Sequence, residues 1–143
     1  QFTFDMDLFS DLHKDAYGFR PRAYHRFYAD DTTDVERQEF WDWAIRDLDI
    51  RMEEEAKAEA EAIASFEKAI ADSMEIANCD RSTAIRYQLE AMDMLNEYDP
   101  GYICYTLGLP YYKGYEEEFL KHLRDPEEDL ALQQMAEYEE YAA

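Results

Sequence analysis

Glycine and proline are scarce in this sequence, with four of each among 143 residues. An all-β domain of this length needs Gly- or Pro-rich turns at intervals of about 8–12 residues, so the scarcity excludes that class of fold. No apolar run approaches the roughly 18 residues that suggest a bilayer-spanning helix, and the first residues lack a signal-peptide pattern. We therefore expect an all-α chain that has no membrane partner.

Cysteine and histidine are also sparse, and neither forms a motif of known chemistry. Cys79 and Cys104 do not make a C-x-x-C pair, and His13, His25 and His122 are scattered along the chain. The signatures of zinc proteases, α/β-hydrolases, P-loop NTPases and dinucleotide-binding proteins are absent. We expect no catalysis, no metal and no cofactor, and the unpaired cysteines indicate a reducing compartment.

Basic residues are too few to balance the acidic ones. Lys and Arg total 14 against 35 Asp and Glu, which gives a formal net charge of −21. Such a charge repels nucleic acid and anionic membranes, so we expect no direct contact with DNA or RNA and a basic protein surface as the partner. Solubility alone needs a net charge of only about 2–8, although a purely solubilising role stays open.

Hydrophobic residues are abundant, at 47%, and they follow a helical period. Thr33 and Glu36 have the spacing of a capping box, and no Gly or Pro follows until Pro100. Apolar residues recur every three or four positions along most of this stretch, which predicts one amphipathic helix over 34–79, roughly 69 Å long. Its Ala56–Ala64 tract has two interpretations. Its small side chains either allow a second helix to approach closely, or they form a strongly helical segment that bridges two packed ends.

Capping signals divide the rest of the chain into short elements. Ser10 is a suitable N-cap for a helix over 11–17, and Asp80, Asp99 and Asp125 can cap later helices. Those later helices are predicted over 81–98, 101–107, 115–124 and 126–141, and the last offers Leu130, Leu132, Met135 and Tyr138 for burial.

The predicted fold is all-α, with one long amphipathic helix and several shorter helices packed as an irregular bundle. We predict a single helical domain over 1–143. Its parts are an arm and a basic, aromatic loop at 1–33, the long acidic helix at 34–79, and a C-terminal helical bundle at 80–143.

Two acidic clusters are the candidate partner-binding residues. The first comprises Glu53, Glu54, Glu55, Glu59 and Glu61 in the middle of the long helix, and the second comprises Glu116, Glu117 and Glu118. Acids in a first helical turn stabilise the helix dipole, which also explains the second cluster without a partner. The first cluster lies mid-helix, where the alternative is a solvated face. The candidate aromatic anchors of the same interface are Trp41, Trp43, Tyr111 and Tyr112.

A basic island interrupts the acidic chain between residues 17 and 28. It contains Arg20, Arg22 and Arg26 and no acidic residue. The island favours either a contact to an anion or an acidic partner, or ion pairs with the protein's own acidic helices. The sequence leaves that choice open.

The stretch from Ser10 to Arg22 reads S-D-L-H-K-D-A-Y-G-F-R-P-R. It resembles the N-terminal S-D-L-x-K-D-x-x-G-F-R-P-R signature of small proteins encoded by tailed bacteriophages. The Phe40-Trp41-Asp42-Trp43 start of the long helix, its Ala/Glu-rich middle and the Leu107-Gly108-Leu109-Pro110 turn are similar to the same family. The resemblance carries no assigned reaction. It implies a phage gene expressed in a bacterium, so the expected location is the host cytoplasm.

A phage origin favours one hypothesis on function. The chain would be a phage-encoded acidic inhibitor of a host nucleic-acid-binding defence complex, a CRISPR effector or a restriction enzyme, and would act by DNA mimicry. Its 21 net charges match the phosphates of about 10 base pairs, although the long helix alone is about four times too dilute in charge. One alternative is a helical structural, assembly or accessory protein of the phage that acts as a homodimer. Another is an inhibitor that binds a different surface through the aromatics and the basic island.

Overall fold

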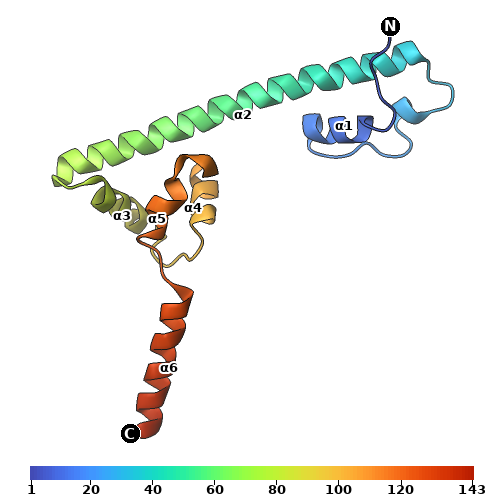
Figure 1. Ribbon diagram of the computed structural model, residues 1–143. Helices are drawn as coiled ribbons and strands as arrows, with labels where there is room; N and C mark the ends of the chain where they lie inside the picture. The colour runs from blue at the N-terminus through green and yellow to red at the C-terminus, as the bar shows by residue number, and fades with distance from the viewer. The chain divides into compact units, whose positions relative to one another are not determined.

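The computed structural model describes residues 1–143, and helices are its only regular elements (Figure 1). In chain order they are α1 (Phe9–Tyr17), the 3-10 turn η1 (Arg26–Tyr28), α2 (Asp34–Ala77), α3 (Arg81–Ala91), α4 (Pro100–Leu107), the 3-10 turn η2 (Tyr111–Lys113), α5 (Tyr115–Leu120) and α6 (Pro126–Ala142). The all-α prediction, with one long helix and several shorter ones, is confirmed. None of these helices combines the length and the apolarity that a bilayer span requires.

The long helix α2 runs for 44 residues without interruption. It begins where the capping box predicted, because the Thr33 hydroxyl accepts a hydrogen bond from the Glu36 backbone N–H at 3.2 Å. It ends at Ala77 because Asn78 takes a left-handed backbone conformation, with φ of 49°. The helix is therefore two residues shorter than predicted from the sequence.

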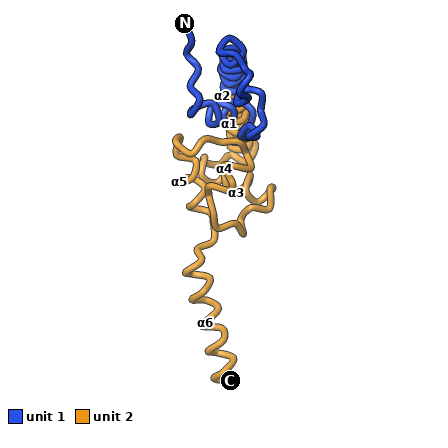
Figure 2. The backbone as a smooth tube through the Cα atoms, turned by 90° about the vertical axis from the view of Figure 1, so that its right-hand side faces the viewer, with its two compact units in different colours: residues 1–57 blue, residues 58–143 orange.

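The contacts of the chain group it into two compact units, unit 1 (Gln1–Lys57) and unit 2 (Ala58–Ala143), which Figure 2 shows in two colours. The boundary lies inside α2, whereas the sequence placed its boundaries near the ends of that helix. The physical reason is local: every side chain from 52 to 58 is exposed, so this stretch of the apolar face packs on nothing. The Ala-rich tract accordingly acts as a strong helix former between two packed segments.

Unit 1 packs α1 on the first part of α2. Leu12 and Ala16 from α1 meet Ala44 from α2 in a small apolar cluster. Beside it, the rings of Phe9 and Phe27 stack with centroids 3.8 Å apart. The prediction that Ser10 caps α1 is wrong, because the helix already begins at Phe9 and the Asp5 carboxylate accepts the N–H groups of the residues just before it.

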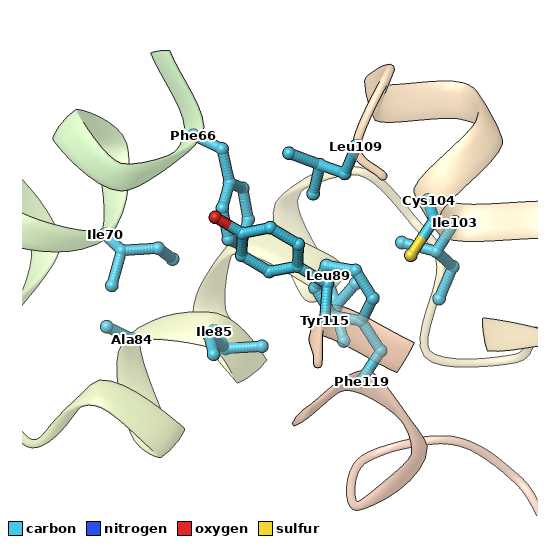
Figure 3. Close-up of a cluster of buried hydrophobic side chains, with 10 residues drawn as sticks. All are labelled: Phe66, Ile70, Ala84, Ile85, Leu89, Ile103, Cys104, Leu109, Tyr115 and Phe119. Carbon is cyan, nitrogen blue, oxygen red and sulfur yellow. The ribbon is translucent and has the colours of Figure 1, made fainter. Parts of the chain in front are cut away.

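Unit 2 buries its own core between the second half of α2 and the helices α3, α4 and α5 (Figure 3). Phe66 meets the rings of Tyr115 and Phe119 edge-on, at centroid distances of 5.4 and 5.7 Å. The predicted caps of α3 and α4 are confirmed, since the Asp80 carboxylate accepts from Thr83 N and the Asp99 carboxylate accepts from Gly101 N, both at 2.8 Å.

Two helices of unit 2 are shorter than the sequence predicted. The helix expected over 81–98 ends at Ala91, where the Met94 N–H bonds back to the Leu89 carbonyl at 2.8 Å and Asp93 takes a φ of 57°. The helix expected over 115–124 ends at Leu120. In both places the helix stops without a Gly or Pro, so no local signal marked its end.

Helix α6 begins as predicted, with the Asp125 carboxylate accepting the Glu127 N–H at 2.8 Å. The predicted burial of its apolar side chains is wrong. Leu130, Leu132, Met135 and Tyr138 are all more than half exposed, and no residue of the helix is buried. The reason is that none of the apolar clusters of the chain includes a side chain from this helix.

Candidate functional site

The acidic side chains far outnumber the partners that the chain provides for them. Eight of the 14 Lys and Arg side chains form ion pairs, and these engage ten of the 35 carboxylates. The other 25 carboxylates have no ion-pair partner within the chain. The negative charge is therefore not cancelled internally, and it remains directed at solvent.

In unit 1 the predicted acidic cluster contributes two free residues. Glu53 and Glu54 are exposed and have no partner, whereas Glu55 accepts from Arg51 Nε at 2.9 Å. Arg51 also donates to the Asp15 carbonyl at 3.0 Å, which ties Glu55 to the edge of α1. Because successive residues of an α-helix project about 100° apart, these three consecutive glutamates point in different directions rather than to one spot.

In unit 2 the same predicted cluster contributes Glu59 and Glu61. Glu61 is exposed without a partner. Glu59 accepts the Tyr112 hydroxyl at 2.5 Å, and this hydrogen bond raises the pKa of Tyr112 above its usual value. The structure thus brings together two predicted site residues, Glu59 and Tyr112, in an internal contact. Tyr111 lies next to them in the chain and is exposed.

The second predicted cluster divides in a similar way. Arg81 holds Glu118 through Nε at 2.7 Å and holds Glu67 through both terminal nitrogens at 2.7 and 2.8 Å. The hydrogen bond from Arg81 lowers the pKa of Glu67, and the Tyr115 hydroxyl donates to the same carboxylate at 2.9 Å. Glu118 therefore stabilises the packing of unit 2.

Glu116 and Glu117 carry no ion pair, and they influence a buried thiol. Burial raises the pKa of Cys104 to about 11, and the negative charges of Glu116, Glu117 and Asp99 add to this shift. A thiol with such a pKa stays protonated at neutral pH, so it is a poor nucleophile. Cys104 is accordingly a core residue.

The basic island binds mainly to the acids of its own unit. Arg20 forms an ion pair with Asp11, and Arg26 lies 2.8 Å from Asp31 and 3.4 Å from Glu36. The structure therefore supports the second of the two interpretations for Arg20 and Arg26. Arg22 is exposed and has no ion-pair partner.

The two tryptophans have different surroundings in unit 1. Trp41 is half-buried against the α1–α2 cluster, whereas Trp43 is 48% exposed. Trp43 forms one wall of a pocket of about 390 Å³, which we call the aromatic pocket. The complete lining is Phe9, His13, Tyr17, Phe19, His25, Phe40 and Trp43. The sequence predicted only Trp43 among these as a site residue. The one sequence feature that indicated the pocket was the density of aromatic residues between 17 and 28.

The chain holds no group of three or more His, Cys, Asp or Glu side chains arranged to bind a metal ion. No protein-family model, curated protein or solved structure matches this chain.

Proposed function

We propose that the chain is an acidic binding protein that occupies the basic, nucleic-acid-binding surface of a host protein complex and thereby inhibits it. The complex in this proposal is a bacterial defence complex, a CRISPR effector or a restriction enzyme, and the carboxylates take the places of DNA phosphates. The observation that carries the proposal is that 25 of the 35 carboxylates have no ion-pair partner within the chain.

The exposed carboxylates of α2 are the first contacts that we assign to this interface. Glu53, Glu54 and Glu61 are exposed and unpaired, so a cationic partner meets them without breaking an internal bond. Glu55, Glu59 and Glu118 already have partners, and their engagement by a host protein requires exchange of those partners. Within the predicted set, the three unpaired glutamates are therefore the best candidates for direct contact with the cationic partner.

Helix α6 supports a protein as the partner. All of its charged residues are acidic, and its large apolar side chains, among them Met135 and Tyr138, are exposed. A helix with exposed apolar and acidic side chains suits a groove of a partner, and its charge requires that the rim of the groove be basic. A second copy of the chain would bring another −21 charges to the same place, which opposes pairing of α6 with itself.

The proposal predicts inhibition of DNA cleavage that weakens as salt increases, because exposed charge contacts are screened over about 10 Å at 0.1 M salt. The assay is cleavage of target DNA by purified CRISPR effectors and restriction enzymes in the presence of increasing amounts of the chain. We expect at least one of these enzymes to be inhibited. Undiminished cleavage by every enzyme at saturating chain would contradict the proposed function.

A triple variant tests the role of the charge itself. Glu53→Gln, Glu54→Gln and Glu61→Gln together should weaken inhibition by about threefold to 150-fold, since each exposed charge contact contributes about 0.2–1 kcal/mol. The matched control replaces the same three residues by Asp, which keeps the charge and should keep most of the inhibition. Equal inhibition by the Gln variant and the parent chain would show that these carboxylates do not imitate phosphates.

A further inference from the structure

The aromatic pocket of unit 1 has walls made only of rings. Phe9 and His13 lie at its buried base, with 1% and 8% exposure, and Phe19 and Trp43 are exposed at its rim. Neighbouring rings meet edge-on, as in the pairs His25–Phe40 at 5.2 Å and Phe40–Trp43 at 5.7 Å. Aromatic rings prefer this edge-on arrangement, so these pairs stabilise the walls of the pocket. Pockets of this size and lining are typical of sites for small organic ligands.

Hydrogen bonds inside unit 1 fix which nitrogen of each imidazole carries the proton. His13 Nδ1 lies 2.7 Å from the Phe19 carbonyl oxygen, which only accepts, so Nδ1 carries the hydrogen. His25 Nδ1 accepts the Phe27 backbone N–H at 3.1 Å, so it is bare. In the neutral rings, His13 Nε2 is therefore an acceptor and His25 Nε2–H is a donor. Burial lowers the pKa of His25, which agrees with a neutral ring.

Both Nε2 atoms are available to a ligand. Every buried side-chain nitrogen or oxygen of the chain has a hydrogen-bond partner. Neither Nε2 has one within the chain, so neither atom is buried, and both rings line the aromatic pocket. The ring centroids of His13 and His25 are 5.7 Å apart. The pocket is therefore lined by two neighbouring imidazoles, one with an acceptor and one with a donor at Nε2.

We infer that the aromatic pocket binds a neutral, planar nucleobase, which stacks on the aromatic walls and pairs one edge with His13 Nε2 and His25 Nε2–H. A nucleobase such as adenine or cytosine carries an amino donor beside a ring-nitrogen acceptor, which complements this pair. The pocket contains no carboxylate and no cationic side chain, so nothing in it compensates a charged ligand. The net charge of −21 further opposes a phosphate group, so the base enters as a free base or a nucleoside. This inference does not depend on the proposed inhibitor function.

Titration of the full chain with adenosine and with cytidine tests the inference. At pH 8 and 0.1 M salt, calorimetry measures the affinity, and the fluorescence of the two tryptophans reports stacking at Trp43. We expect saturable binding with quenched fluorescence. N6,N6-dimethyladenosine, which lacks the amino donor, should bind about three- to tenfold more weakly, and adenosine monophosphate should also bind more weakly.

Three variants separate the pocket from the rest of the surface. Trp43→Ala should weaken adenosine binding about tenfold because base–aromatic stacking is lost, and Trp43→Phe, which keeps a ring, should retain most of it. Tyr24→Ala is the matched control, since Tyr24 is an exposed aromatic residue of the same unit outside the pocket.

Several results would overturn the inference. The first is the absence of saturable binding of either nucleoside up to about 10 mM. The second is equal affinity for adenosine and its dimethyl analogue. The third is an equal loss of adenosine affinity in the Trp43→Ala and Tyr24→Ala variants. Tighter binding of tetramethylammonium than of adenosine would likewise show that the rings form a cation site instead.

Discussion

Arg81 is the residue of unit 2 whose removal tests the packing most sharply. It links α2 to α5 from the first turn of α3, with four N–H···O contacts of 2.7–3.2 Å to Glu67 and Glu118. These side chains are 29–40% exposed, so solvent screens the attraction, and each pair contributes at most about 1 kcal/mol. Arg81→Ala should therefore lower the free energy of unfolding of unit 2 by up to about 2 kcal/mol, which is at most roughly a thirtyfold change in its unfolding equilibrium.

Hydrogen exchange resolved by peptide measures this change where it occurs. Backbone amides of α3 and α5 that exchange through unfolding of unit 2 should lose protection by a factor of up to about thirty, with amides of α1 as the internal reference. Arg86→Ala is the control, because Arg86 lies on the same helix, is exposed and makes no ion pair. We expect its effect to stay within about 0.5 kcal/mol.

The pH dependence of the Arg81→Ala effect provides a second test. The pKa of Glu67 in the folded chain lies below its unfolded value of about 4.3–4.5, so its contribution to stability is present above that value and is lost as pH falls. The difference in free energy of unfolding between the parent chain and the variant should be largest at pH 7 and should shrink as pH falls through the pKa of Glu67. A constant difference from pH 7 to pH 3, or no difference at pH 7, would refute the role assigned to Arg81.

Two further substitutions address the core and the caps. Phe119→Ala should destabilise unit 2 by about 3–5 kcal/mol, because this ring is fully buried and meets Phe66 edge-on. Urea unfolding followed by circular dichroism should show a much lower midpoint for the variant. An unchanged midpoint would contradict the core that Figure 3 shows. Asp80→Ala should cost about 1 kcal/mol through loss of the hydrogen bond from Thr83 N, whereas Asp80→Asn should retain most of the stability in the same measurement.

The parts of the fold that the sequence predicted are those encoded in a few neighbouring residues. The capping box at Thr33 and the Asp caps of α3, α4 and α6 all depend on contacts within one helical turn. The ends of α3 and α5 were not predicted, because both helices end without a Gly or Pro. The exposure of α6 was missed because a helical apolar stripe does not say whether anything covers it.

The candidate site was predictable in composition and not in arrangement. The excess of acids is visible in the sequence, but Arg51, Tyr112 and Arg81, which engage Glu55, Glu59 and Glu118, are distinguished only by three-dimensional contacts. The aromatic pocket is formed by residues from α1, from the loop after it and from α2, so no local sequence motif predicts it.

The central claim is that unpaired carboxylates of this chain compete with DNA for cationic side chains of a host complex. The most direct measurement is the affinity of the chain for a purified effector that it inhibits, taken between about 50 and 200 mM salt with and without target DNA. The account predicts that affinity falls steeply with salt and that bound DNA excludes the chain. Salt-independent affinity, or a complex that holds chain and DNA together, would contradict it.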